Sequence, residues 1–155
     1  MSRDLLQACW GDASALFDRL EGAWDLGRTI EQQATMTGVA TFTRRGPDTL
    51  AYREEGRVRL PDGKSFDAHR EYRFERAPQG FVVFFAEEPP RLFHGIELVR
   101  EDDALAGSAI HLCSPDTYDS NYRFLADGTF VIRHAVRGPR KDYVSVTTFR
   151  RPDTR

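Results

Sequence analysis

The residue types best suited to hold a small molecule are arginines that share a strand face with apolar side chains. In the run from Gly22 to Ile30, Trp24 and Arg28 fall on one face, because successive side chains of a strand point to opposite faces. Burying an unpaired guanidinium is costly, so Arg28 requires a carboxylate, an aromatic ring or the anion of a ligand. Arginine binds carboxylates and phosphates through two parallel hydrogen bonds, which indicates anion recognition as one chemistry for this chain.

The same alternation places more polar side chains on inward-facing rows. If Trp24 faces inward, so do four residues of the following runs: Tyr52, Glu54, Arg70 and Tyr72. In one interpretation Arg28 and Arg70 pair with Glu54 or stack on an aromatic ring, since buried charges are normally paired. In the other interpretation the two arginines clamp the carboxylate or phosphate of a ligand.

The densest cluster of reactive residue types is the segment AIHLCSPDTYDSNY. His111 and Cys113 share a face, Tyr122 follows a turn that contains proline, and His94 lies on the neighbouring expected strand. Cys113 would serve as a nucleophile if His94 or His111 lay within hydrogen-bond reach. The same residues with His134 would suit a metal or haem. In a third interpretation the histidines and tyrosines form a satisfied hydrogen-bond network inside a polar barrel.

A further basic segment, GPRKDY, precedes the last expected strand. Gly138 and Pro139 force a turn, after which Arg140 and Lys141 either stay solvated or attract an anion to the rim of a cavity. A ligand enters a barrel at its rim, so Arg140 and Tyr143 are candidate binding residues.

The elements that position these residues are one helix and a series of short strands. Asp12 is a suitable N-cap for a helix over residues 12–20, and Gly22 follows its end. Alternating runs then predict about ten strands, with hairpin signals such as Asp127–Gly128 and a bulge or break at Gly56. Tight turns pair neighbouring strands antiparallel, and closure removes exposed edges. The sequence therefore predicts an all-β, antiparallel up-and-down barrel with a short N-terminal helix.

Length and composition fit a single domain over residues 1–155, with a helical segment at 1–21 and a barrel at 22–151. The formal net charge of -2 argues against a broad basic surface for nucleic acid or an anionic membrane. Cys9 and Cys113 lack paired spacing, so neither a disulfide scaffold nor a zinc site is indicated, and we expect no cofactor. The first residues lack the apolar core of a secretory signal, so we expect a cytoplasmic protein.

Two short features invite comparison with a known group of barrels. The sequence Gly22-Ala23-Trp24 opens the first strand, and Arg150 or Arg151 ends the last. This arrangement resembles the lipocalins and other calycins, in which such an arginine packs over the tryptophan and closes the base of the barrel. Over almost the whole chain the sequence resembles an uncharacterised bacterial calycin-like domain family, through the pieces GAWDLGRTI, LAYREEG, AHREYRFE, FHGIEL, AIHLCSPDTY and GPRKDY. The resemblance implies a calycin-like barrel and brings no established activity.

Together these features predict a monomeric or homodimeric barrel whose lumen binds a small polar or anionic, partly aromatic organic ligand. Arg28 and Arg70 would hold its charged end, and the other candidate binding residues are Tyr52, Tyr72, His94, His111, Cys113, Tyr122, Arg140 and Tyr143. One alternative is an enzyme that uses the same cavity with His111 or His94 as general acid or base. Others are a haem or metal protein, and a protein-interaction module, which would expose an apolar patch and enclose no cavity.

Overall fold

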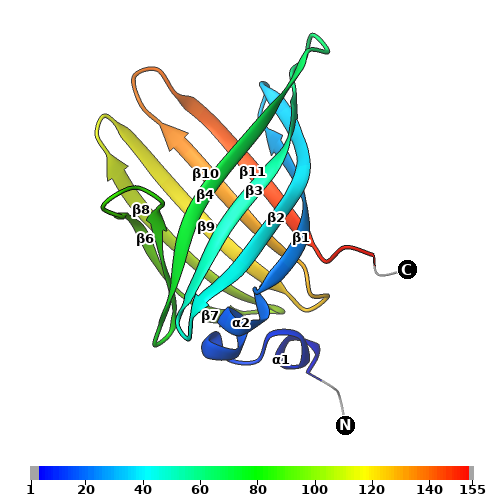
Figure 1. The fold of residues 1–155 in the computed structure, drawn as a ribbon, viewed down its shortest axis with the longest axis vertical. Coiled ribbons are helices and arrows are strands. Elements are labelled where there is room, and N and C mark those ends of the chain that lie inside the picture. The colour runs from blue at the N-terminus through cyan, green and yellow to red at the C-terminus, as the bar shows by residue number, and fades with distance from the viewer. Residues whose placement is uncertain (1–3, 154–155) are drawn as a thin grey trace.

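The computed structural model describes residues 4–153, which form an antiparallel up-and-down barrel with two short helices at its N-terminal end (Figure 1). The helices are α1 (Leu5–Trp10) and α2 (Ala13–Arg19). The strands are β1 (Gly22–Ile30), β2 (Ala34–Gly46), β3 (Thr49–Arg59), β4 (Ser65–Ala77), β5 (Gly80–Phe85), β6 (Arg91–Glu97), β7 (Val99–Glu101), β8 (Ala104–Cys113), β9 (Asp116–Leu125), β10 (Phe130–Arg137) and β11 (Asp142–Arg150). The all-β up-and-down barrel predicted from the sequence is therefore confirmed.

Consecutive strands pair with each other except β6 and β7, which are the two ends of the sheet. Since β1 also pairs with β11, the order is β6-β5-β4-β3-β2-β1-β11-β10-β9-β8-β7. The barrel is nearly closed, because β6 lies against β8 without a ladder of hydrogen bonds between them in the described chain. A Cβ atom on Gly107 would come within 2.5 Å of the carbonyl oxygen of Glu97, so glycine permits this close approach of the two strands.

The strand count, the start of one strand and the number of helices differ from the sequence prediction. Residues 4–153 form eleven strands rather than about ten, because the expected strand over residues 92–99 divides at the buried Leu98 into β6 and β7. Strand β9 begins at Asp116 rather than near Tyr122, since its first residues are polar and resemble a loop. The second helix, α2, matches the predicted one, whereas α1 is too short for its periodicity to be recognised.

The expected bulge or break at Gly56 is wrong. Strand β3 passes through Gly56 without a register shift, and Gly56 lies opposite Gly38 on β2. A Cβ atom on Gly38 would come within 2.1 Å of the carbonyl oxygen of Glu55. The two glycines therefore allow the strands to approach closely, and the irregularities fall instead at residues 44–46 and 83–84.

An aromatic core fills the end of the barrel next to the helices. The indoles of Trp10 and Trp24 stack with ring centroids 6.1 Å apart, and Phe130 meets Trp24 edge-on at 4.8 Å. The indole nitrogen of Trp10 donates to the carbonyl oxygen of Leu125 at 2.7 Å. This end is a solid apolar filling, so a ligand has to enter from the opposite end, where the hairpins β3–β4, β8–β9 and β10–β11 stand in Figure 1.

Arg151 closes the base of the barrel over the first strand. Its guanidinium carbon lies 3.8 Å from the centroid of the Trp24 ring, and its nitrogens donate to the carbonyl oxygens of Arg19, Glu21 and Ala23 at 2.6–3.0 Å. Gly22 has a φ of +117°, and a Cβ atom there would lie 2.9 Å from the guanidinium. The spacing of glycine, tryptophan and C-terminal arginine noted in the sequence thus corresponds to one packed unit.

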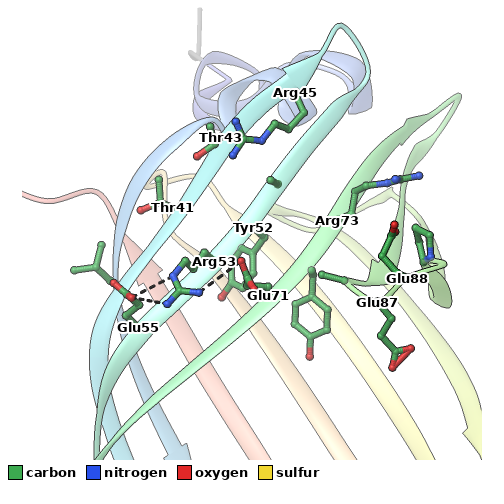
Figure 2. Close-up of a pocket in the computed structure, with 15 residues that line it drawn as sticks. Thr41, Thr43, Arg45, Tyr52, Arg53, Glu55, Glu71, Arg73, Glu87 and Glu88 are labelled. Carbon is green, nitrogen blue, oxygen red and sulfur yellow. Dashed lines mark hydrogen bonds and ion pairs between the residues drawn. The ribbon is translucent and has the colours of Figure 1, made fainter.

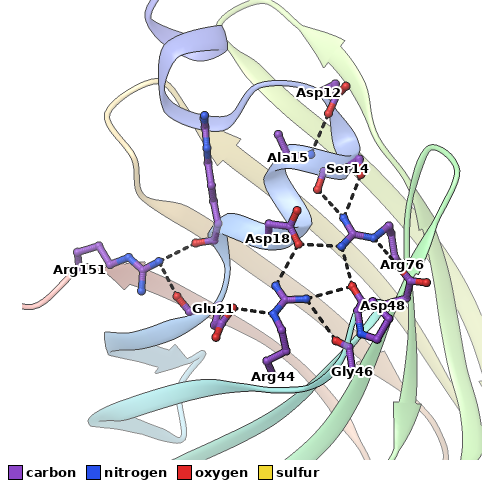
Figure 3. A network of polar contacts seen from close by, with 12 residues as sticks. Asp12, Ser14, Ala15, Asp18, Glu21, Arg44, Gly46, Asp48, Arg76 and Arg151 are labelled. Carbon is purple, nitrogen blue, oxygen red and sulfur yellow. Dashed lines mark hydrogen bonds and ion pairs between the residues drawn. The ribbon is translucent and has the colours of Figure 1, made fainter.

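A second group of arginines joins α2 to strands β2 and β4 (Figure 3). Asp18 accepts hydrogen bonds from Arg76 of β4 at 2.7 Å and from Arg44 of β2 at 3.0 Å. Arg44 also donates to Glu21 at 2.7 Å, and the guanidinium of Arg76 lies over the ring of Phe17. These contacts hold the helical segment as a plug at one end, while the other end has no such cover among residues 4–153.

Candidate functional site

The interior of the barrel opens into a cavity of about 410 Å³ at the end opposite the helices, referred to below as the open-end cavity. It is lined by Arg28, Ile30, Gln33, Arg70, Glu71, Tyr72, Phe85, Phe93, Tyr118, His134, Val136, Tyr143 and Ser145. A small void of about 20 Å³ lies deeper, next to Tyr52, Glu54 and Tyr122. The volume of the open-end cavity is within the range that small-molecule sites occupy.

Arg28 is paired inside the barrel with Glu54. Its two terminal nitrogens donate to the two carboxylate oxygens at 2.7 and 2.9 Å, and its Nε donates to Thr147 at 2.7 Å. The hydroxyl of Tyr52 donates to the same carboxylate at 2.6 Å. Burial alone would raise the pKa of Glu54, but the hydrogen bonds and charge of Arg28 hold it below its ordinary value. Of the two interpretations of Arg28, the structure places it in the carboxylate pair.

Arg70 differs from Arg28 because it has no ion pair among residues 4–153. It lies opposite Glu54 in the β3–β4 ladder, lines the open-end cavity, and its guanidinium carbon is 6.0 Å from the centroid of the Tyr72 ring. The Arg28–Glu54 pair is neutral as a unit, so Arg70 contributes an uncompensated positive charge. The electrostatic character of the cavity therefore favours an anion.

Aromatic rings form much of the wall beside Arg70. Phe93 stacks on Phe85 with ring centroids 4.6 Å apart and on Tyr72 at 5.8 Å, and it meets Tyr118 edge-on at 5.7 Å. Phe93 sits where the β5–β6 register shifts, so that both Phe93 and His94 are buried although they are adjacent in sequence. Such a wall suits a planar apolar body.

His134 contributes an imidazole to the same wall. Its ring stacks on Phe93 with centroids 5.9 Å apart, and its Nδ1 shares a hydrogen bond of 2.7 Å with the hydroxyl of the fully buried Ser120. Burial, together with the positive charges of Arg70 and Arg28, lowers the pKa of His134 to about 4. The imidazole is therefore uncharged at neutral pH.

His94 and His111 lie behind Phe93 and are not among the described residues that line the open-end cavity. His94 is 4% exposed, and its Nε2 shares a hydrogen bond of 2.8 Å with the hydroxyl of Tyr122. Burial, and then the proximity of His134 and His111, lowers the pKa of His94 to about 3. Nδ1 of His94 and Nε2 of His111 are buried without a hydrogen-bond partner in the described chain.

The remaining predicted residues divide between the interior and the rim. Tyr52 and Tyr122 are buried beside the deeper void, whereas Tyr72 and Tyr143 line the open-end cavity. The sulfur of Cys113 accepts a hydrogen bond of 3.4 Å from Arg91. Arg140 is exposed and lies outside the lining of the cavity. The structure thus brings Arg28, Arg70, Tyr72 and Tyr143 together and sets Cys113 and Arg140 apart from them.

A larger groove of about 600 Å³ lies on the outer face of β2, β3 and β4 and is also lined by residues of the connection between β5 and β6, such as Glu87 and Glu88 (Figure 2). Arg53 lies in this groove and contacts Glu55 at 2.7 Å and Glu71 at 3.5 Å, while Arg73 is paired with Glu75. Arg53 and Arg73 already have carboxylate partners. The third arginine of the groove, Arg45, shares it with four glutamates, Glu55, Glu71, Glu87 and Glu88, so the groove favours an anion less than the open-end cavity does. We therefore assign the candidate site to the open-end cavity despite its smaller volume.

Sequence reasoning missed the central position of Phe93 and considered His134 only as a metal ligand. The register shift at Phe93 changes which residues face inward, and no single residue type in the sequence marks it. Among residues 4–153, no three histidine, cysteine, aspartate or glutamate side chains are grouped to hold a metal ion. Within the same residues, no helix has the length and apolar character needed to cross a membrane.

Exposed apolar side chains also occur, as the protein-interaction alternative requires. Leu92 on β6 and Ile110 and Leu112 on β8 are each more than half exposed, at 52%, 73% and 69%. They coexist with the open-end cavity, whereas that alternative expected no enclosed space.

The barrel is similar in structure to several solved proteins. One is EF1p2_mFAP2b bound to DFHBI, with 15% identity, a TM-score of 0.48, and coverage of 91% of this chain and 100% of that chain. Another is a redesigned beta barrel, b11L5F_LGL, with 14% identity, a TM-score of 0.46, and coverage of 91% and 96%. A third is the S-type phycobiliprotein lyase CPES from Guillardia theta, with 11% identity, a TM-score of 0.47, and coverage of 93% and 94%.

Among curated proteins the sequence has no match. It does match a protein family over residues 20–151, a range that begins at the end of α2 and includes every strand of the barrel as well as Arg151. The chain therefore belongs to the Family of unknown function (DUF6314).

Proposed function

We propose that this protein binds a small aromatic anion in the open-end cavity, with Arg70 as the partner of the anionic group. The observation that carries the proposal is the contrast between two inward-facing arginines. Arg28 is neutralised by Glu54, whereas Arg70 lines the cavity and has no carboxylate partner among residues 4–153. An anion beside Arg70 would give the positive charge of this side chain a partner.

The walls support an aromatic body for the ligand. Tyr72, Phe85 and Phe93 present stacked or tilted rings to the cavity, and Tyr118 adds an edge-on ring. A flat ring buried among them gains both apolar contact and favourable ring geometry. The other candidates of the sequence prediction take supporting roles, with Tyr143 at the entrance and Tyr52 and Tyr122 below the cavity.

The test is calorimetric titration of the purified protein with cinnamate and with its neutral analogue cinnamamide. A hydrogen bond to a charged group contributes about 1.5–3 kcal/mol, so cinnamate should bind roughly tenfold or more tightly than cinnamamide. The difference should disappear in Arg70→Gln.

Arg57→Gln provides the matched control, because Arg57 is an exposed arginine on β3 that pairs with Asp67. This variant should retain the preference for cinnamate. Equal affinity for the two compounds in the unmodified protein, or a preference that survives in Arg70→Gln, would contradict the proposal.

A further inference from the structure

Arg70 and His134 line the open-end cavity from β4 and β10, which lie on opposite sides of the barrel in the strand order. Arg70 has no ion pair among residues 4–153, whereas Phe93, next to His134, is surrounded by three imidazoles. His134 lines the cavity, while His94 and His111 contact Phe93 from behind, with ring centroids 4.0 and 5.6 Å from that of Phe93. A ligand that fills the cavity therefore meets a cationic group and an imidazole group at different places.

We propose that the ligand is an aromatic carboxylate with an uncharged hydroxyl at the end remote from the carboxylate, and that His134 recognises this hydroxyl. The inference rests on the proposed function, since it takes Arg70 as the partner of the carboxylate. It adds the chemical identity of the second end of the ligand and names a specificity-determining residue.

The hydrogen bond between His134 and Ser120 supports this assignment. The contact of 2.7 Å uses Nδ1 of His134 and leaves Nε2 with no hydrogen-bond partner within residues 4–153. If the serine hydroxyl donates to Nδ1, Nε2 carries the proton and donates; if Nδ1 donates, Nε2 accepts. A hydroxyl both donates and accepts hydrogen bonds, so it suits Nε2 in either tautomer.

The other two imidazoles lie behind Phe93 and are not among the described residues that line the cavity. Nδ1 of His94 and Nε2 of His111 are buried and unpartnered among the described residues. Of the three imidazoles, His134 is therefore the one that a ligand in the cavity meets.

A second anionic group of the ligand is disfavoured beside His134. It would need a cationic partner, but the pKa of His134 is about 4 and that of His94 is about 3, so both imidazoles remain uncharged at neutral pH. The carboxylate of Glu54 is also near, and it raises the pKa of His134 only in part against burial and the two arginines. The ligand class that fits is a monoanion with a neutral polar end.

The experiment compares cinnamate, para-hydroxycinnamate and para-carboxycinnamate by calorimetric titration at neutral pH. We expect the hydroxyl to raise affinity roughly threefold to tenfold, the range of an ordinary neutral hydrogen bond, and the second carboxylate to lower it below that of cinnamate. In His134→Phe, which keeps an aromatic ring on Phe93, the gain from the hydroxyl should vanish while cinnamate still binds.

Two further variants separate recognition from folding. Ser120→Ala removes the group that fixes Nδ1 of His134, so the gain from the hydroxyl should fall, whereas His69→Phe on the exposed outer face of β4 should leave it unchanged. Circular dichroism checks that each variant folds. The inference is overturned if para-hydroxycinnamate and cinnamate bind equally, or if the gain persists in His134→Phe. If the affinity for cinnamate is the same in Arg70→Gln as in the unmodified protein, the proposed function is contradicted, and this inference, which rests on it, is contradicted as well.

Discussion

The guanidinium of Arg28 and the carboxylate of Glu54 meet inside the barrel through two hydrogen bonds of 2.7 and 2.9 Å. Their side chains are 10% and 3% exposed, so each charge depends on the other for compensation. The pair also affects Arg70 on the neighbouring strand, because it takes up the carboxylate that lies opposite Arg70 in the β3–β4 ladder.

Removing one member of this pair should be strongly destabilising. Arg28→Met leaves the Glu54 carboxylate buried without its main partner, and breaking a buried pair in this way costs about 3–5 kcal/mol. Arg28→Met combined with Glu54→Gln removes both charges of the pair, so no buried carboxylate is left without its partner and the double variant should be more stable than Arg28→Met alone. Urea unfolding of the three proteins measures the difference. A double variant no more stable than Arg28→Met would contradict this account of the pair.

The same substitutions should change anion binding through Arg70. In Arg28→Met, Glu54 is free to neutralise Arg70, which already contributes to lowering the pKa of that carboxyl. Cinnamate should then bind at least several-fold more weakly, and Arg28→Met with Glu54→Gln should restore most of the affinity because Arg70 again lacks a partner. Calorimetry on both variants checks this. If the double variant binds no better than Arg28→Met, the charge of Arg70 is not what attracts the anion.

Acid should weaken the fold through the buried histidines. The pKa values of His94 and His134 in the folded protein are about 3 and about 4, below the ordinary value of 6.5, so the unfolded chain binds protons that the folded chain does not. Stability is therefore unaffected by these groups above pH 6.5 and falls as the pH decreases toward 4, by about 2 kcal/mol per histidine between pH 7 and pH 5. Unfolding free energies measured across this window provide the check.

The pH dependence has its own controls. His134→Phe removes one buried titrating group and should make the stability less sensitive to pH between 7 and 5. His69→Ala removes an exposed histidine and should leave the change of unfolding free energy with pH as it is in the unmodified protein. An unchanged slope in His134→Phe would show that its imidazole titrates equally in the folded and unfolded chains.

Arg151 should stabilise the base of the barrel, whereas its neighbour should not. Arg151→Met removes a cation–π contact with Trp24 and hydrogen bonds to three carbonyl groups, so we expect a loss of about 1–3 kcal/mol. Arg150→Met alters an exposed residue and should change stability by less than about 0.5 kcal/mol. Thermal unfolding compares the two. Equal effects would mean that the packing of Arg151 on Trp24 contributes nothing.

Much of the architecture was predictable because strand periodicity is local. Trp24, Arg28, Glu54 and Arg70 all face inward as their alternation requires, and Asp12 caps α2 as predicted. These features depend on residues within one or two turns or strands of each other. The arginine over Trp24 was implied by the resemblance to the calycins and not by periodicity; of Arg150 and Arg151, it is Arg151 that occupies this position.

The division of roles between the two arginines was not predictable from local pattern. Whether Glu54 pairs with Arg28 or with Arg70 depends on the stagger of three strands, and residues from β1 and β3 have to meet across β2. The position of Phe93 depends on a register shift in the β5–β6 pair. Both features arise from tertiary geometry, which alternation along a single strand does not encode.

The most direct measurement of the central claim is a crystal structure of the protein with cinnamate. The account predicts one cinnamate in the open-end cavity, with its carboxylate about 2.7–3.2 Å from the guanidinium nitrogens of Arg70 and its ring against Phe93. Cinnamate bound instead in the outer groove beside Arg53, or an open-end cavity that stays free of cinnamate at saturating concentration, would contradict it.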